Sequence, residues 1–171
     1  MPELLAKSAF GGRSITIGTT TLTEATVGPL TSVAPYPGQI DATSAALGYP
    51  FPAPNTISGP LLWAGRDLAM LRGVAPDLTG LAATTDQTGG WAALRLAGPH
   101  AADALMRHTP LDLREAAFPV GCCTRAPLNH LSIIVAREQE GFLILIFRSM
   151  AQTAWHELET ALHALHARAG V

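Results

Sequence analysis

Charged side chains are scarce in this sequence. Asp, Glu, Lys and Arg make up 14% of its 171 residues, against about 25% in an ordinary soluble domain. Between Ser14 and Gly65 the only acidic or basic side chains are Glu24 and Asp41, and Lys7 is the only lysine. A monomer with so few charges exposes wide neutral or apolar patches, which commonly mark contacts with other proteins. The sequence therefore favours a surface that a partner covers. The alternative is a Thr-, Gly- and Pro-rich surface that is soluble enough alone.

Long apolar runs and paired cysteines are also missing. No apolar run approaches the roughly 20 residues that a membrane-spanning helix requires, and the first residues have no basic region followed by an apolar core, so no secretory leader is expected. The two cysteines, Cys122 and Cys123, are adjacent and cannot close an ordinary disulfide loop. These features predict a cytoplasmic protein. A net charge of -2 without a basic cluster argues against nucleic-acid binding.

Motifs that would mark cofactor binding or catalysis are absent. The 16 glycines include no GxGxxG and no GxxxxGK[ST], so no phosphate-binding loop is predicted. The scattered Ser, His and Asp residues have no supporting motif such as GxSxG. We therefore predict no catalytic, cofactor-binding or metal-binding residue in this chain.

The pattern of apolar and turn residues predicts strands and helices in mixed order. In the first half, extended chain is expected from Ile15 to Val33 with a break at Gly28, then a helix over residues 39–47 that ends at Gly48. A hairpin is predicted from residues 61–64 and 68–71, and a second strand pair from Leu81–Thr85 and Trp91–Ala97 around a glycine-rich loop.

The second half continues with a helix after Gly98 and Pro99, then strands over residues 122–126, 131–135 and 142–147. A last helix is predicted from Met150 to Ala167, with Ser149 as its N-cap and an apolar stripe of Trp155, Leu158, Leu162, Leu165 and Ala169. This order predicts an α+β fold with helices packed on antiparallel sheets. We expect two small subdomains, residues 14–80 and 81–171, after a mobile N-terminal arm over residues 1–13.

Four motifs in the same order carry a resemblance to a known family. They read TDQTGGW at residues 85–91, LAGP at 96–99, PLDLREAAFPVG at 110–121 and FRSMAQTAWHELE at 147–159. Together they resemble the gamma subunit of heterotetrameric sarcosine oxidase, most strongly from Thr84 to Leu165. One departure is Arg66, which stands where that family tends to have a proline in an apolar-Trp-x-Gly-Pro-Asp turn. The resemblance implies a truncated aminomethyltransferase-like fold and supplies the order in which the strands pair.

The resemblance also implies a function. The chain would be a noncatalytic subunit of a complex that demethylates sarcosine to glycine, reduces oxygen to hydrogen peroxide, and yields 5,10-methylenetetrahydrofolate or formaldehyde. FAD, FMN, NAD and tetrahydrofolate would belong to the alpha and beta subunits, and zinc to the delta subunit. The main contact of this chain would be the alpha subunit. Two alternatives remain: a freestanding folate-binding protein of the aminomethyltransferase type, and a scaffold for an oxidase of another N-methyl amine.

Six residues are candidates for the partner interface: Arg148, Phe147, Asp112, Arg114, Phe118 and Trp63. Arg148 is singled out because it ends an apolar strand just before a helix N-terminus, where its charge opposes the helix dipole. We expect a carboxylate to hold it, either Asp112 of the same chain or an acid of a partner.

Two clusters admit a functional or a structural interpretation. His156, Glu159, His163 and His166 lie at spacings of 3, 4 and 3 on one flank of the last helix and could converge on a metal ion, or could be a solvated polar flank. Cys122 and Cys123 could be reactive thiols. On a strand, however, they face opposite sides, and their surroundings lack the Lys-Gly-Cys-aromatic-x-Gly-Gln pattern of related iron–sulfur assembly factors. We favour one core cysteine and one that faces a loop or an interface.

Overall fold

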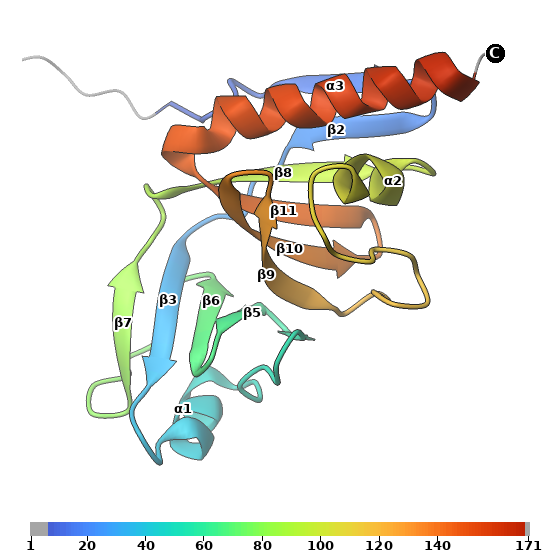
Figure 1. The fold of residues 1–171 in the computed structure, drawn as a ribbon. Helices are drawn as coiled ribbons and strands as arrows, with labels where there is room; N and C mark the ends of the chain where they lie inside the picture. Colours follow the sequence, from blue (N-terminus) through green and yellow to red (C-terminus); the bar gives the residue numbers. More distant parts are fainter. Residues whose placement is uncertain (1–6, 170–171) are drawn as a thin grey trace, which may run out of the picture.

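A computed structural model describes residues 7–169. Its strands form two antiparallel sheets, which confirms the predicted α+β class (Figure 1). The six-stranded sheet has the order β1 (Ser14–Ile17), β2 (Thr20–Glu24), β8 (Trp91–Ala97), β11 (Gly141–Phe147), β10 (Leu131–Glu138) and β9 (Cys123–Leu128). The five-stranded sheet has the order β4 (Ile57–Ser58), β5 (Leu61–Gly65), β6 (Leu68–Arg72), β3 (Leu30–Pro35) and β7 (Ala82–Asp86).

Helices cover the outer faces of both sheets. The long helix α3 (Ala151–Ala169) and the short α2 (Ala101–Met106) lie on one face of the six-stranded sheet, while α1 (Ile40–Leu47) lies on the five-stranded sheet (Figure 1). The predicted end of α1 at Gly48 is confirmed, with φ 74° at that residue. No helix in the described part of the chain is long and apolar enough to cross a membrane.

The inner face of the six-stranded sheet packs on the five-stranded sheet. Strand β11 is therefore buried on both sides: Ile144 and Ile146 contact the core under α3, whereas Leu143 and Leu145 contact the core shared with β5 and β6. This double burial explains why β11 is a continuous apolar run rather than an alternating one. The hairpin of β10 and β11 is confirmed. It turns at Gly141, whose φ of 118° and close approach to the Leu96 carbonyl leave no room for a side chain.

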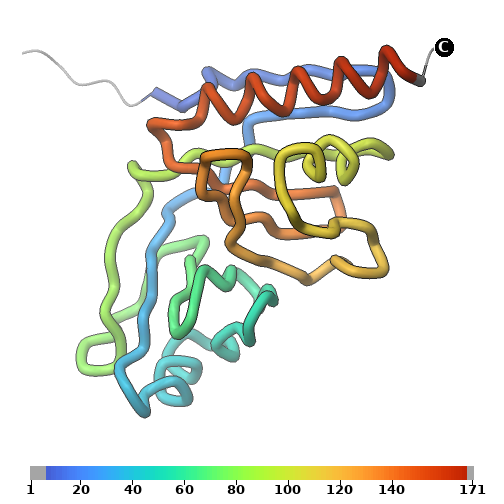
Figure 2. The backbone as a smooth tube through the Cα atoms, viewed as in Figure 1, coloured from blue at the N-terminus to red at the C-terminus, as the bar shows by residue number. Residues whose placement is uncertain are grey.

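The second predicted strand pair is wrong. Strand β7 pairs with β3, whereas β8 pairs with β2 and β11 in the other sheet. Residues 87–90 carry the chain from one sheet to the other (Figure 2). The physical difference is apolar content: β8 has buried side chains on both faces and occupies the sandwich centre, whereas β7 has four exposed residues out of five and lies at an edge.

The sheets also exchange strands across the expected boundary at residue 80. Strands β1 and β2, from the first half, extend the six-stranded sheet beside β8, and β7, from the second half, extends the five-stranded sheet beside β3. Residue 80 therefore does not divide one sheet from the other. The hydrogen bonds of each sheet hold both halves of the chain together.

Residues 7–13 do not form the mobile arm that we predicted from the sequence. Phe10 is buried with its ring 5.5 Å from that of Trp155 on α3. The Glu24 carboxylate accepts the backbone N–H groups of Phe10 (3.3 Å) and Gly12 (2.6 Å). Arg13 pairs with Glu159 at 3.0 Å. One buried aromatic ring thus fixes a glycine-rich segment whose sequence has no periodicity. Residues 1–6 lie outside the described residues.

Helix α3 carries the predicted apolar stripe. Trp155, Leu158 and Leu162 are buried against the sheet, and Leu165 is half-buried. The predicted N-cap is wrong, because Arg148–Met150 form a 3-10 turn and the Ala151 N–H donates to the Arg148 carbonyl. Ser149 thus lies inside helical backbone, whereas an N-cap residue needs an extended conformation.

Candidate partner interface

The chain leaves the core between β11 and α3. After the buried run up to Ile146, Phe147 is 39% exposed and Met150 is 45% exposed. The Phe147 ring lies against the Trp91 ring at 4.4 Å between centroids, and the Trp91 Nε1–H donates to Gln87 Oε1 at 3.3 Å. We call Trp91, Phe147 and Met150 the junction patch. Aromatic residues and Met are among the residue types enriched at protein interfaces.

Arg148 borders the junction patch and does not form the predicted internal ion pair. Its backbone N–H donates to the Gly90 carbonyl at 2.8 Å, and its exposed guanidinium donates to the carbonyl of Lys7. Asp112, one of the two partners that we considered, is bound by Arg114 instead. Among the described residues Arg148 pairs with no carboxylate. Within residues 7–169 its charge therefore has no acidic counterpart.

An open groove of about 530 Å³ lies beside Arg148 and Trp91. One wall is the N-terminal segment at Ser8 and Gly12, and the other is the connection from β2 to β3. Both oxygens of Glu24, within the groove, accept the backbone bonds described above and hold the N-terminal segment in place. The groove continues the junction patch, so the two form one surface of mixed polarity.

Two further interface candidates form an exposed ion pair on the connection from α2 to β9. Arg114 donates to Asp112 through Nε at 2.8 Å and through Nη2 at 2.5 Å. The hydrogen bond from the Arg114 side chain, with a second from its backbone N–H, lowers the pKa of Asp112 to about 2. Asp112 is therefore ionised throughout the physiological range, and the pair is electrically neutral as a unit.

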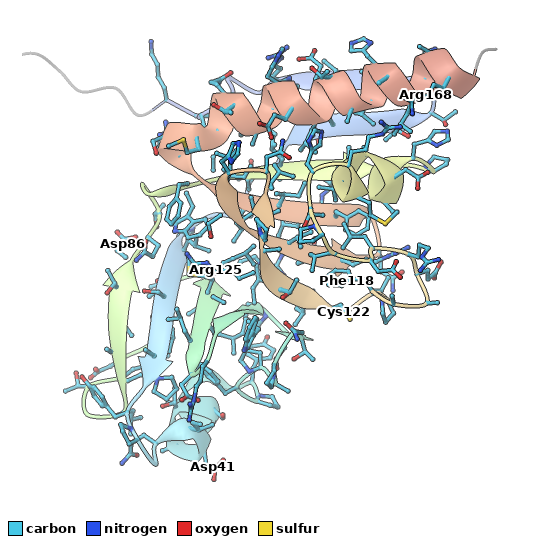
Figure 3. The ribbon with its side chains drawn as sticks, in the orientation of Figure 1. Asp41, Asp86, Phe118, Cys122, Arg125 and Arg168 are labelled. Atoms are coloured by element: carbon cyan, nitrogen blue, oxygen red, sulfur yellow. The ribbon has the colours of Figure 1, made fainter. Side chains whose placement is uncertain are left out.

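The last two candidates are less available for contact. Phe118 is buried, with its ring stacked on Phe142 at 6.5 Å, so it anchors the connection to the core and exposes little surface to a partner. Its position in that connection is visible in Figure 3. Trp63 is half-buried on β5, where its carbonyl accepts Sγ–H of Cys123 at 3.4 Å. Four interface candidates therefore lie apart from the junction patch. Among the described residues, no hydrogen bond or ion pair joins it to Asp112, Arg114, Phe118 or Trp63.

The two cysteines face opposite sides, as their adjacent positions predict, but both contact a core, whereas we favoured one that faces a loop or an interface. Cys123 is buried between the sheets, and burial raises the pKa of its thiol to about 12. Cys122 is half-buried against the core under α3, and Figure 3 shows it at the start of β9. Because the thiolate is the nucleophilic form, Cys123 is inert at neutral pH.

The histidine flank of α3 is exposed at His156, His163 and His166. Its single carboxylate, Glu159, is engaged by Arg13 at 3.0 Å and by Trp155 Nε1–H at 3.1 Å. Within residues 7–169, no group of three or more His, Cys, Asp or Glu side chains is placed to hold a metal ion. The solvated interpretation of this flank fits the geometry better.

An ionic cluster that we did not predict from the sequence joins the two sheets. Glu138 on β10 accepts Arg72 of β6 at 2.5 Å and Arg95 of β8 at 2.8 Å. Burial raises the pKa of Glu138, but the hydrogen bonds and charges of Arg95 and Arg72 outweigh burial and lower it below its usual value. The only indication of this cluster in the sequence was a single arginine in each of two otherwise apolar strands. These are Arg72 in LAMLR and Arg95 in WAALRLA. The cluster links β6 of the five-stranded sheet to β8 and β10 of the six-stranded sheet.

Comparisons with known proteins identify a similar solved structure. No protein-family model and no curated protein matches this chain. Among solved structures, it is similar to a chain of the heterotetrameric sarcosine oxidase from Corynebacterium sp. U-96, solved in complex with pyrrole 2-carboxylate. The TM-score is 0.82 at 21% sequence identity, over 95% of this chain and 97% of that chain. At this identity the match establishes a shared fold over nearly the whole length of both chains.

Proposed function

We propose that this chain is the gamma-type, noncatalytic subunit of a heterotetrameric sarcosine oxidase. The observation that carries the proposal is the end-to-end match to one chain of such a complex. The match covers 95% of this chain and 97% of that chain, which supports the same place in an assembly.

The surface supports a binding role. The junction patch places exposed aromatic and thioether side chains next to Arg148, a cation without a carboxylate among the described residues. Aromatic residues, Met and Arg are the types enriched at protein interfaces. We infer that an acid of the main partner, the alpha subunit, pairs with Arg148, and that the beta and delta subunits complete the assembly.

The architecture supports a division of labour in which other subunits carry the cofactors. Every strand pair among the described residues is antiparallel. That part of the chain therefore holds no βαβ unit to direct a helix N-terminus at a nucleotide pyrophosphate. We assign FAD, FMN, NAD and tetrahydrofolate to the alpha and beta subunits, and zinc to the delta subunit. The complex would convert sarcosine to glycine with formation of hydrogen peroxide.

Co-expression with the oxidase subunits encoded in the same genome tests the proposal. We expect the chain to co-elute with them at 1:1 stoichiometry and the complex to produce hydrogen peroxide from sarcosine. Expressed alone, the chain should self-associate and carry no flavin absorbance, because its low charge leaves apolar surface uncovered. An active complex that is equally stable without this chain would contradict the proposal.

Two measurements separate the alternatives. Calorimetric titration of the isolated chain with tetrahydrofolate should give no heat of binding, whereas a freestanding one-carbon enzyme would bind it stoichiometrically. Turnover of the purified complex with a series of N-methyl amines identifies the substrate. Sarcosine should be preferred, and a preference for another amine would assign the chain to a related oxidase.

A further inference from the structure

Strand β7 is an uncovered edge. It ends the five-stranded sheet, with β3 on its inner side, and within the described residues no strand lies beyond it. Figure 1 shows it at the periphery, away from the six-stranded sheet and α3. Ala82 is buried, but the four residues from Ala83 to Asp86 are exposed. Both faces of the strand and its outer edge are therefore accessible.

The register fixes which backbone groups point outward. At one end the carbonyl of Leu81 accepts an N–H from the residue after β3 at 2.9 Å, and at the other the N–H of Gln87 donates to the first residue of β3 at 2.7 Å. Residues of an antiparallel strand alternate between bonding their neighbour and pointing away from it. With Leu81 and Gln87 bonded to β3, the N–H and C=O groups of Thr84 and Asp86 point outward.

Nothing in β7 guards this edge. Natural sheets protect edge strands with lysine, proline, bulges or a covering element. The sequence of β7 is AATTD, with one charge and no proline, and its pairing with β3 is regular. Strand β9, at an edge of the other sheet, differs: it contains Arg125 and Pro127, and its Cys123 N–H donates to Asn55 at 3.0 Å. The edge of β7 has the properties of a site for strand addition.

The edge is continuous with the candidate interface. Asp86 lies at the end of β7 nearest to β8 (Figure 3), and the next residue, Gln87, accepts the indole N–H of Trp91 in the junction patch. One partner can therefore contact both surfaces.

We propose that an extended segment of the partner subunit adds antiparallel to β7 as a sixth strand of this sheet and bonds the outward groups of Thr84 and Asp86. Antiparallel addition continues the arrangement of the whole sheet. The segment carries small or β-branched side chains beside the Ala and Thr of β7, and a Lys or Arg opposite Asp86, which is the single charge of the strand. The inference rests on the proposed function for the existence of a partner.

A proline substitution tests the strand directly. Thr84→Pro removes an N–H that points away from β3, so the ladder inside the chain is kept while strand addition is blocked. Thr84→Val keeps the N–H and changes only the side chain, and is the matched control. We expect Thr84→Pro to weaken assembly with the oxidase subunits about tenfold or more, and Thr84→Val to assemble like the unmodified chain. Both should keep the unmodified far-UV circular dichroism. Assembly of Thr84→Pro at full affinity would overturn the inference.

Hydrogen exchange of the unmodified chain decides the matter even if Thr84→Pro fails to fold. The amides of Thr84 and Asp86 should exchange quickly in the isolated chain and slowly in the complex. A complex in which they still exchange quickly overturns the added strand and leaves the proposed function intact. If no complex forms at all, both the added strand and the proposed function are overturned. Protection in the isolated chain that increases with its concentration would identify a second copy as the occupant and would also overturn the inference.

Discussion

Replacing Glu138 with Gln should weaken the contact between the two sheets. The substitution keeps the size of the side chain but removes the charge that holds Arg72 and Arg95. The three side chains are 20% to 25% exposed, so two guanidinium groups would remain mostly desolvated without a counter-charge. Glu140 offers a matched control, because it lies 3.7 Å from Arg95 but is 79% exposed.

The magnitude follows from this degree of burial. Breaking a fully buried ion pair costs about 3 to 5 kcal/mol, whereas an exposed pair contributes about 0 to 1 kcal/mol. A cluster that is mostly but not fully buried should lie between them, so we expect Glu138→Gln to lower the free energy of unfolding by about 2 to 3 kcal/mol. For a chain of this length that corresponds to a fall in Tm of roughly 5 to 10 °C. Glu140→Gln should cost about 0.5 kcal/mol or less.

The pH dependence has a definite sign. The pKa of Glu138 is lower in the folded chain than in the unfolded chain. Its stabilisation is therefore fully present above the unfolded pKa of about 4.3 and is lost as the pH falls through the folded pKa. The stability difference between the unmodified chain and Glu138→Gln should be largest near neutral pH and should shrink below about pH 4.

Urea unfolding followed by circular dichroism, repeated from pH 7 to pH 3, measures these differences. Equal stability of Glu138→Gln and Glu140→Gln at pH 7 would refute the reasoning, as would a difference that does not change with pH. The triple variant Arg72→Met, Arg95→Met and Glu138→Leu gives a second test, because replacing all members of a buried ionic cluster by apolar groups is commonly near neutral. It should be more stable than Glu138→Gln alone.

Three other substitutions test the N-terminal segment, the interface and the thiols. Phe10→Ala should lower the free energy of unfolding by about 2 to 4 kcal/mol in urea unfolding, because the ring fills the core beside α3; an effect below about 0.5 kcal/mol would mean that residues 7–13 are not part of the core. Arg148→Ala should leave chain stability within about 0.5 kcal/mol, since its guanidinium is exposed, yet weaken assembly with the oxidase subunits. Arg66→Ala, which removes a side chain that is 96% exposed and is not an interface candidate, is its control, and equal effects of the two on assembly would contradict a specific role. At pH 8, mass spectrometry should find iodoacetamide on Cys122 well before Cys123, whose pKa is about 12; equal rates would contradict its burial.

Local sequence patterns predicted the elements whose partners are close in the chain. The hairpins β5 to β6 and β10 to β11 follow from apolar strands joined by short polar or glycine-containing turns. The stripe on α3 follows from the helical period, and the opposite faces of Cys122 and Cys123 follow from the strand period of two. In each case the pattern spans only a few residues, so it can be recognised directly in the sequence.

Contacts between distant segments were decided only by the tertiary structure. Strands β7 and β8 are close in sequence with a typical hairpin loop between them. However, β8 has buried residues on both faces and pairs with β2 and β11, whereas β7 is mostly exposed and pairs with β3. Phe10 becomes a core residue because α3 presents Trp155 to it across 145 positions of sequence. The pairing of Arg72 and Arg95 with Glu138, and the outward backbone of β7, likewise depend on which strands lie side by side. Which distant residues are buried against one another is a property of the assembled sheets, and no local pattern records that pairing.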